Sequence, residues 1–177
     1  MHSSCEIAAQ ESFLNVYRMY KNEEAAGDAV DKPIDAARRS IQLNDKSANA
    51  HSLLTDLYGR KISLGDAMFA GPKFGPKVQA ENTKAMASDD KNPHVWASLG
   101  REYLMTPKTF GGDIAKAKES FQKSLAVDLS QDGTWVWLSK SFQKQRDKTK
   151  ARDASLHFLK LNPASQFALA TATGLEK

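Results

Sequence analysis

Histidine and cysteine are the side chains that most often carry catalysis or bind metal ions, and this chain of 177 residues has few of them. Its single cysteine, Cys5, allows no intrachain disulfide and no metal site built from cysteines. Its histidines follow neither the His-Glu-x-x-His pattern nor another ligand spacing, and they are His2, His51, His94 and His157. The phosphate-binding patterns GxxxxGK(S/T) and GxGxxG are absent. We therefore expect no metal ion, no cofactor and no enzymatic activity, and we expect the histidines to be core or surface residues.

Basic side chains are the other candidates for chemistry, and they are unevenly distributed. Residues 1–90 carry 11 Lys and Arg against 13 Asp and Glu, whereas residues 91–177 carry 14 against 8, which gives net charges of −2 and +6. The second half therefore either suits an anionic partner or has a solvated basic surface. A nucleic-acid partner is disfavoured, because the aromatics near the basic run 140–152, Trp135 and Phe142, are expected in the core.

The composition is that of an ordinary globular domain, with 41% apolar and 26% charged residues. No stretch approaches the ~18 apolar residues of a membrane span, and no signal peptide is recognisable. The opening Met-His-Ser-Ser-Cys suits a stub left after removal of a leader. Since Cys5 follows small residues, it also suits a lipid-attachment site, although the required apolar leader is absent. The sequence leaves the compartment open, cytoplasmic or periplasmic.

Apolar residues at helical spacing predict helices along the whole chain. The first is expected over residues 6–22, and the second starts with Pro33 in its first turn and has an apolar side of Ile34, Ala37, Ile41 and Leu43. Ser47 and Asp113 are expected to cap two further helices, which run to about Leu64 and Val127. The remaining helices are expected over residues 77–88, from Pro93 to before Pro107, around 135–142, over 151–161 and over 165–173.

Two segments rich in glycine and proline, Gly65–Pro76 and Thr106–Gly112, are predicted to be long turns. They share a short sequence motif, which is Pro72-Lys73-Phe74-Gly75 in one and Pro107-Lys108-Thr109-Phe110-Gly111 in the other. Phe74 and Phe110 either tuck down as plugs over the ends of their helix pairs, or form the rim of a ligand site at which Lys73 and Lys108 face an anion.

The clearest pattern is Trp96-x-x-Leu99-Gly100-x-x-Tyr103, followed by Ala117-x-x-x-Phe121. Trp96, Leu99 and Tyr103 fall on one face of a helix, and Gly100 lets a neighbouring helix approach closely. The predicted ends of successive helix pairs, Asp45, Asp90, Leu129 and Pro163, are 45, 39 and 34 residues apart. The period is thus 34 residues, with insertions of 11 and 5 that we assign to the two long turns.

These residues resemble the signature of tetratricopeptide repeats, which are helix-turn-helix units of 34 residues. The resemblance covers roughly residues 33–163, and Thr106–Ala117 is also similar to a "tP-x-x-FGGD-x-x-KA" segment of bacterial repeat proteins with long turns inside the repeat. It implies an all-α fold, an α-α superhelix of about eight or nine helices in a single domain. The parts of this domain would be N-terminal helices over 6–45, repeats over 46–90, 91–129 and 130–163, and a capping helix over 164–175.

The resemblance further implies a non-enzymatic scaffold that binds a protein or peptide on its concave surface. The row of positions beside the core stripe comprises Asn49, Ser52, Asp56 and Arg60, then His94, Ala97, Arg101 and Met105, then Gly133, Val136, Lys140, Gln143 and Lys144. Its four basic side chains suit an acidic peptide or a free C-terminal carboxylate. The alternative is a small anionic ligand or transported solute held between the long turns and the groove. Self-association through the terminal helices is left open.

Overall fold

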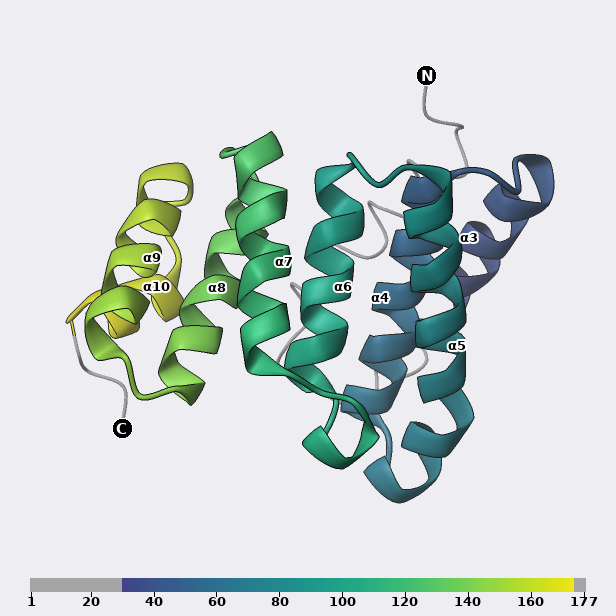
Figure 1. Cartoon of the computed structure of the whole chain (residues 1–177), viewed down its shortest axis with the longest axis horizontal. Helices are drawn as coiled ribbons and strands as arrows, with labels where there is room; N and C mark the ends of the chain where they lie inside the picture. The colour runs from purple at the N-terminus through teal and green to yellow at the C-terminus, as the bar shows by residue number, and fades with distance from the viewer. Residues whose placement is uncertain (1–29, 174–177) are drawn as a thin grey trace. The chain divides into compact units, whose positions relative to one another are not determined.

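Short polar side chains fix the starts of most helices in the computed structural model, which describes residues 30–173 (Figure 1). A side-chain oxygen accepts a hydrogen bond from the backbone of the first turn at Ser47, Asp66, Asn92, Asp113 and Asp147. The elements are α3 (Asp31–Leu43), α4 (Ala48–Leu64), α5 (Ala67–Ser88), α6 (Pro93–Met105), the 3-10 turn η1 (Lys108–Phe110), α7 (Ile114–Val127), α8 (Asp132–Lys144), α9 (Lys148–Leu161) and α10 (Gln166–Thr173). The described part of the chain is therefore all-α. The helix expected over residues 6–22 lies outside it, as do Cys5 and His2.

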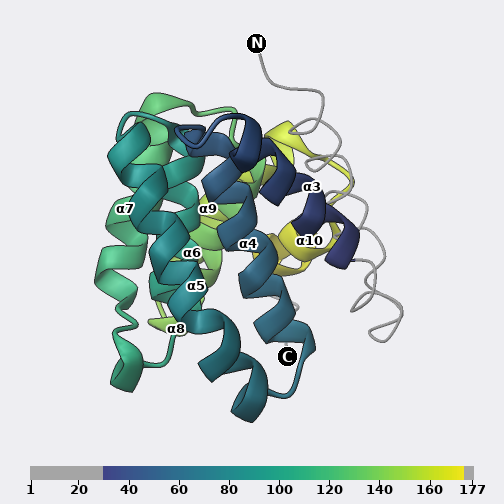
Figure 2. The ribbon, with the colours of Figure 1, turned by 90° about the vertical axis from the view of Figure 1, so that its right-hand side faces the viewer.

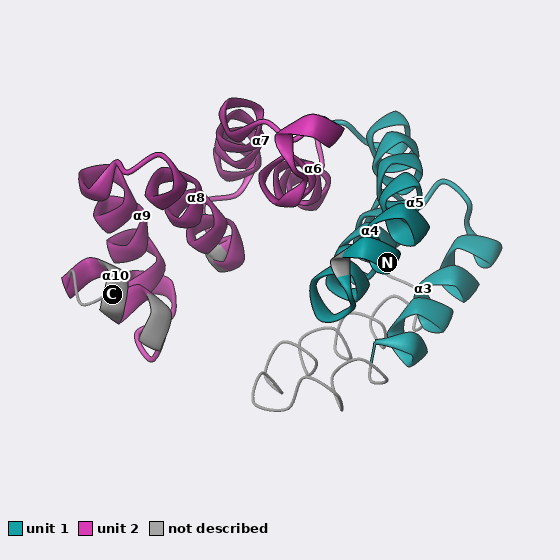
Figure 3. Ribbon diagram, turned by 90° about the horizontal axis from the view of Figure 1, so that it is seen from below, with its two compact units in different colours: residues 1–90 teal, residues 91–177 magenta. Residues whose placement is uncertain are grey.

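The chain divides into two compact units, residues 1–90 and 91–177, which we call unit 1 and unit 2 (Figure 3). The division falls where the sequence places the boundary between its first and second repeats. Unit 1 has its own apolar core, to which Ile34, Leu54, Leu57, Tyr58 and Val78 contribute. The core of unit 2 contains Leu104, Phe121, Leu125, Leu138 and Phe142. The organisation as a single domain of three repeats stays a prediction.

The segment Gly65–Pro76 is not a long turn, and this prediction was wrong. Helix α5 begins at residue 67 and continues through Pro72 and Pro76, so that only residues 65–66 connect it to α4 (Figure 2). Both prolines follow a glycine, and a glycine has no Cβ to clash with the proline ring when the backbone is helical. Three residues at helical spacing hold the segment on the core of unit 1. Ala70 and Val78 are buried, and the ring of Phe74 stacks on that of Tyr58 with centroids 5.7 Å apart.

The segment Thr106–Gly112, by contrast, is the turn that the sequence predicts. Gly111 adopts φ +96°, a left-handed conformation that favours glycine. At Gly112 a Cβ atom would overlap the carbonyl of Thr106, so no other residue fits without moving the backbone. Asp113 then accepts hydrogen bonds from the N–H groups of Ala115 and Lys116, at 2.8 and 3.1 Å, and starts α7 as predicted.

The predicted core stripe of α6 is only half-buried. Trp96, Leu99 and Tyr103 all keep part of their surface exposed, whereas Val95 and Leu104 are buried. Large aromatic side chains seldom bury every atom, and here the ammonium of Lys123 lies 4.4 Å from the ring centroid of Trp96. On α3, Ile34 and Ala37 are buried as expected, but Leu43 is 74% exposed because it is the last residue of its helix.

One contact between the helices of a pair recurs at equivalent positions with different residues. In α6–α7 a Cβ on Gly100 would lie 2.5 Å from the ring of Phe121, which confirms the close approach predicted at this glycine. In α8–α9 the equivalent residues are Ser139 and Ser155, whose hydroxyls lie 2.9 Å apart. In α4–α5 the equivalent positions hold Thr55 and Asn82, each 2% exposed. Ser155, which stands where α7 has Phe121, is therefore matched by a serine opposite it.

Candidate binding surface

The predicted groove row of unit 2 lies on α6 and α8, the first helices of the two pairs, and these helices touch each other. Arg101 on α6 and Lys140 on α8 occupy equivalent positions, and both are half-buried. His94 and Met105 are exposed at the two ends of the row on α6, while Val136 and Gln143 on α8 are half-buried. None of the row residues of unit 2 is acidic. The row therefore presents positive charge to an anion, beside the apolar side chains of Met105 and Val136.

Three predicted row residues do not present a side chain to a partner. Ser52 and Ala97 are each 2% exposed, and the hydroxyl of Ser52 donates to the carbonyl of Ala48 at 2.8 Å. Gly133, the first residue of the row on α8, is exposed but has no side chain to contribute. The row is therefore shorter than the helical spacing of the sequence implies.

Two lysines of the row on α8 have roles that the sequence does not reveal. The ammonium of Lys144 donates to the carbonyl of Leu104 at 2.9 Å. It thereby satisfies one of the last carbonyl groups of α6, where a cation is favoured by the helix dipole. The ammonium of Lys140 lies 4.7 Å from the ring centroid of Trp137. Lys144 is thus a capping residue between two helices, and the other basic residues of this row in unit 2 are Arg101 and Lys140.

The other predicted groove residues belong to unit 1. Asn49, Asp56 and Arg60 are half-buried on α4, where Asp56 occupies the position equivalent to Arg101 and Lys140. Because an acidic residue stands there, unit 1 does not repeat the basic row of unit 2. The prediction that Arg60 joins the basic residues of α6 and α8 in one groove stays a prediction.

The two halves of the predicted turn rim differ in surroundings. Phe74 is part of the core contacts of unit 1, and Lys73 and Lys77 hold their ammonium groups 5.2 and 5.5 Å from its ring centroid. Phe74 is therefore a packing residue within helix α5, and it is not a plug at the end of a turn. Phe110 is 73% exposed at the end of η1, and Lys108 beside it is exposed as well. The plug interpretation is wrong for Phe110.

His51 is a core histidine with two partners, one of which no sequence pattern reveals. It is 1% exposed, and its Nε2 lies 2.9 Å from the carbonyl of Asp45, so this nitrogen carries a hydrogen. Its Nδ1 lies 2.5 Å from a carboxylate oxygen of Glu81 on α5. The ring thus joins the turn before α4 to α5. His157 on α9 is exposed and stacks on Trp135 with ring centroids 4.4 Å apart.

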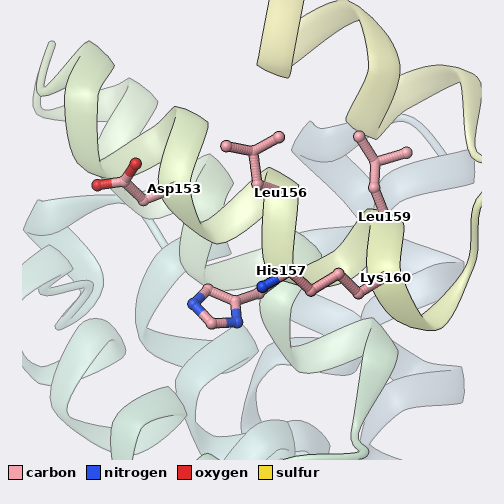
Figure 4. A pocket seen from close by; sticks show the side chains of 5 residues that line it. All are labelled: Asp153, Leu156, His157, Leu159 and Lys160. Carbon is pink, nitrogen blue, oxygen red and sulfur yellow. The ribbon is translucent and has the colours of Figure 1, made fainter.

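An open hollow of about 560 Å³ lies along α9, bordered by Asp153, Leu156, His157, Leu159 and Lys160 (Figure 4). The side chains do not converge, since Leu156 and Leu159 point to one side of the helix and His157 to the other. Within residues 30–173 no group of three His, Cys, Asp or Glu residues is arranged to hold a metal ion. In the same range, none of the helices combines the length and the apolar character that crossing a membrane requires.

Two surface carboxylates carry hydrogen bonds that lower their pKa. The pKa of Asp147 falls below its usual value because the backbone N–H and the ammonium of Lys150 both bond to it, with Lys118 adding positive charge nearby. The pKa of Asp128 is lowered by hydrogen bonds from Ser130 and Gln131. Both carboxylates organise the polar turns next to α8, and neither belongs to the groove row.

Comparison with known proteins identifies the fold. No protein-family model matches the chain, and no curated protein matches it. Among solved structures, TTC0263, described as a thermophilic TPR protein in Thermus thermophilus, is similar with a TM-score of 0.66 at 12% identity, over 97% of this chain and 90% of that one. Two structures of MamA are similar at 14% identity, with TM-scores of 0.57 and 0.56, over 92% and 84% of this chain and 79% and 80% of theirs. The fold is thus that of tetratricopeptide-repeat proteins.

Proposed function

We propose that this chain, with its tetratricopeptide-repeat fold, is a non-enzymatic interaction scaffold that binds an extended acidic segment of a partner protein or peptide. The segment would lie on α6 and α8 of unit 2. The observation that carries the proposal is the pair of half-buried basic residues at equivalent positions, Arg101 and Lys140, in a row without an acidic residue. Concave faces lined by the first helices are the usual binding surfaces of stacked helix pairs.

The chemistry of the row favours a carboxylate in an extended chain. The guanidinium of Arg101 presents a planar set of donors that matches a carboxylate, and Lys140 adds a second positive charge on the next helix. Met105 is exposed at the end of the row, and an unbranched thioether adapts to different apolar side chains. The row therefore suits acidic residues that alternate with apolar ones. It differs from the clamp of some family members, which pairs lysines with asparagines, because Asn49 is the single asparagine of the row and lies in unit 1.

The proposal is tested with an array of synthetic acidic, neutral and basic peptides, followed by fluorescence anisotropy on the acidic peptide that binds best. Arg101→Glu is expected to weaken this binding at least about tenfold, since a charge-assisted hydrogen bond is lost and repulsion replaces it. Arg39→Glu on the exposed side of α3 makes the same change in charge and should alter the affinity less than about twofold. An array that returns basic peptides, or equal effects of the two substitutions, would contradict the proposal.

The small-ligand alternative loses its structural basis. It requires two long turns that form a rim, but one of them, Gly65–Pro76, is mostly helix, and its aromatic residue Phe74 packs in the core of unit 1. The single remaining long turn, at 106–112, exposes Phe110 to solvent. An enclosed site between the turns is therefore not part of the proposal.

A further inference from the structure

The turn between α6 and α7 and the turn between α8 and α9 form one edge of unit 2, which we call the turn edge and define as residues 104–118 and 144–150. Figure 1 shows both turns at the lower end of their helices. Two hydrogen bonds join them. Lys144 donates to the carbonyl of Leu104 at 2.9 Å, and Lys118 donates to the side-chain oxygen of Gln145 at 2.6 Å. The turn edge is thus a single surface built from two separate stretches of sequence.

Most of the positive charge of unit 2 lies on this edge. The turn edge contains seven Lys and Arg and two Asp, a net charge of +5, whereas residues 91–177 as a whole carry 14 basic and 8 acidic residues, a net charge of +6. Both aspartates cap helices, since Asp113 accepts from the backbone at the start of α7 and Asp147 does so at the start of α9. Their charges face helix N-termini, which carry partial positive charge of their own, and Asp147 also pairs with the ammonium of Lys150 at 3.0 Å. The edge is therefore strongly basic toward solvent.

The type of basic residue indicates what the edge attracts. All of the basic residues except Arg146 are lysines. Lysine is a mobile point charge that attracts anions without fixing their geometry, whereas recognition of a particular phosphate or carboxylate favours arginine. The edge thus suits an extended anionic surface better than one specific anionic group.

One aromatic side chain protrudes from the turn edge. Phe110 is 73% exposed at the end of η1, and Met105 is 53% exposed at the end of α6. The other aromatics near the edge are covered, because lysine ammonium groups lie 5.4 to 5.9 Å from the ring centroids of Tyr103 and Phe142. Single-stranded nucleic acid is usually held by several stacking aromatics, and this edge offers one. An isolated apolar residue among lysines is typical of proteins that bind at the lipid–water interface.

We propose that the turn edge of unit 2 docks on the surface of an anionic lipid bilayer. The lysines face the headgroups, and the ring of Phe110 enters the interface between headgroups and acyl chains. Charge complementarity selects the partner, because juxtamembrane basic residues are attracted to anionic leaflets within a Debye length of the surface. The docking uses no membrane-spanning segment, and of the groove row it involves only Met105 and Lys144, at the ends of α6 and α8.

The test is co-sedimentation of the full chain with vesicles of phosphatidylcholine alone or with about 30% phosphatidylserine, at about 0.1 M KCl, where the Debye length is about 10 Å. We expect binding to the anionic vesicles, no measurable binding to the neutral ones, and release at about 1 M KCl. Lys108→Glu combined with Lys148→Glu, one exposed residue from each turn, should weaken binding at least about twentyfold, since each basic residue near the surface contributes roughly fivefold.

A matched pair of substitutions tests the apolar contact. Phe110→Ala should weaken binding to anionic vesicles by roughly fivefold to tenfold, because the ring no longer enters the interface. Phe69→Ala removes an equally exposed phenylalanine in the first turn of α5 in unit 1, where the neighbouring residues are not strongly basic, and it should leave binding unchanged. Lys32→Glu combined with Arg39→Glu on α3 is the control for the charge change. Circular dichroism of each variant checks that the fold is intact.

Three outcomes would overturn the proposal. They are equal binding to neutral and anionic vesicles, equal loss in the α3 control and the turn-edge variant, and binding to a DNA duplex or to polyglutamate without binding to vesicles. The first two would mean that the edge is not the docking surface, and the third that its partner is a nucleic acid or an acidic protein. Failure here is separable from failure of the proposed function, because Arg101→Glu is outside the edge and should leave vesicle binding unchanged.

Discussion

The helix pairs α4–α5 and α6–α7 contain nearly the same short sequence of proline, lysine, phenylalanine and glycine. This sequence is helical in α4–α5 and forms a turn in α6–α7. Helix α4 is four residues longer than α8, and α5 is eight residues longer than α9. The turn between α4 and α5 has two residues, whereas the turn between α8 and α9 has three. In α6–α7 the helices have the same lengths as in α8–α9, and the connection has eight residues. The predicted insertions of 11 and 5 residues are both present, but only the second is a turn.

The difference shows that the residues next to a glycine or proline, and the contacts of the segment, determine whether it forms a helix or a turn. In α5 each proline follows a glycine, and Phe74 finds a partner in Tyr58, so that helix and core support each other. In the α6–α7 connection two glycines adjoin, one of them in the left-handed conformation, and Phe110 is 73% exposed. The cap at Asp66 starts α5 before its first proline is reached.

Among substitutions that test this comparison, Gly112→Ala is expected to have the largest effect on stability. A Cβ at this position overlaps the carbonyl of Thr106, so the turn must rearrange, and we expect a loss of about 3 kcal/mol in the free energy of unfolding. Urea denaturation followed by circular dichroism measures it. Gly59→Ala, in a part of α4 with open space around the glycine, is the control and should be neutral or slightly stabilising. Equal stability of the two variants would mean that the turn is not tightly constrained.

A change of opposite sign is expected in the other helix pair. Pro76→Ala should stabilise the chain by about 2 kcal/mol, because alanine restores the helical hydrogen bond to the carbonyl of residue 72. Thermal unfolding should show a rise of about 2 to 4 °C for each kcal/mol. A fall in the melting temperature would contradict the helical conformation of residues 67–76 and would favour the turn that the sequence predicts.

The smallest effect concerns the contact inside each pair. The hydroxyl of Thr55 is buried and has no hydrogen-bond partner among residues 30–173, whereas the equivalent residue in α6 is Gly100. Thr55→Val replaces the hydroxyl with a methyl group of similar size and should stabilise the chain by about 1 kcal/mol. Val95→Thr, which introduces a hydroxyl at a buried position of α6, should destabilise it. A destabilising Thr55→Val would mean that the hydroxyl makes a contact of its own.

Local rules recovered most of the described fold from the sequence. Ser47 and Asp113 cap helices as predicted, and α6 begins at Pro93 and ends at Met105. These features depend on residues within one turn of each other, which is why a sequence pattern can reveal them. The start of α5 departs from the local rule that proline ends a helix, because a glycine precedes each proline and Ala70, Phe74 and Val78 recur at helical spacing.

The candidate binding surface was less predictable, because its residues depend on partners far away in the sequence. The equivalence of Arg101 and Lys140 follows from the repeat period, but the hydrogen bond from Lys144 to Leu104 spans 40 residues. Glu81 meets His51 across 30 residues, and no spacing rule connects them. The two stretches of the turn edge could be recognised as one surface only after the helices had been placed.

The recurring contact inside the helix pairs also bears on how such chains change by duplication and recombination. Glycine lies opposite phenylalanine in α6–α7 and serine opposite serine in α8–α9, whereas the equivalent buried positions of α4–α5 hold threonine and asparagine. A single helix moved from one pair to another would bring phenylalanine against serine or threonine, and these combinations overfill the contact. When a whole helix pair is moved, the two residues that face each other at this contact stay together. The residues at this contact are therefore matched within a helix pair, and exchanging a single helix between pairs would disturb the match.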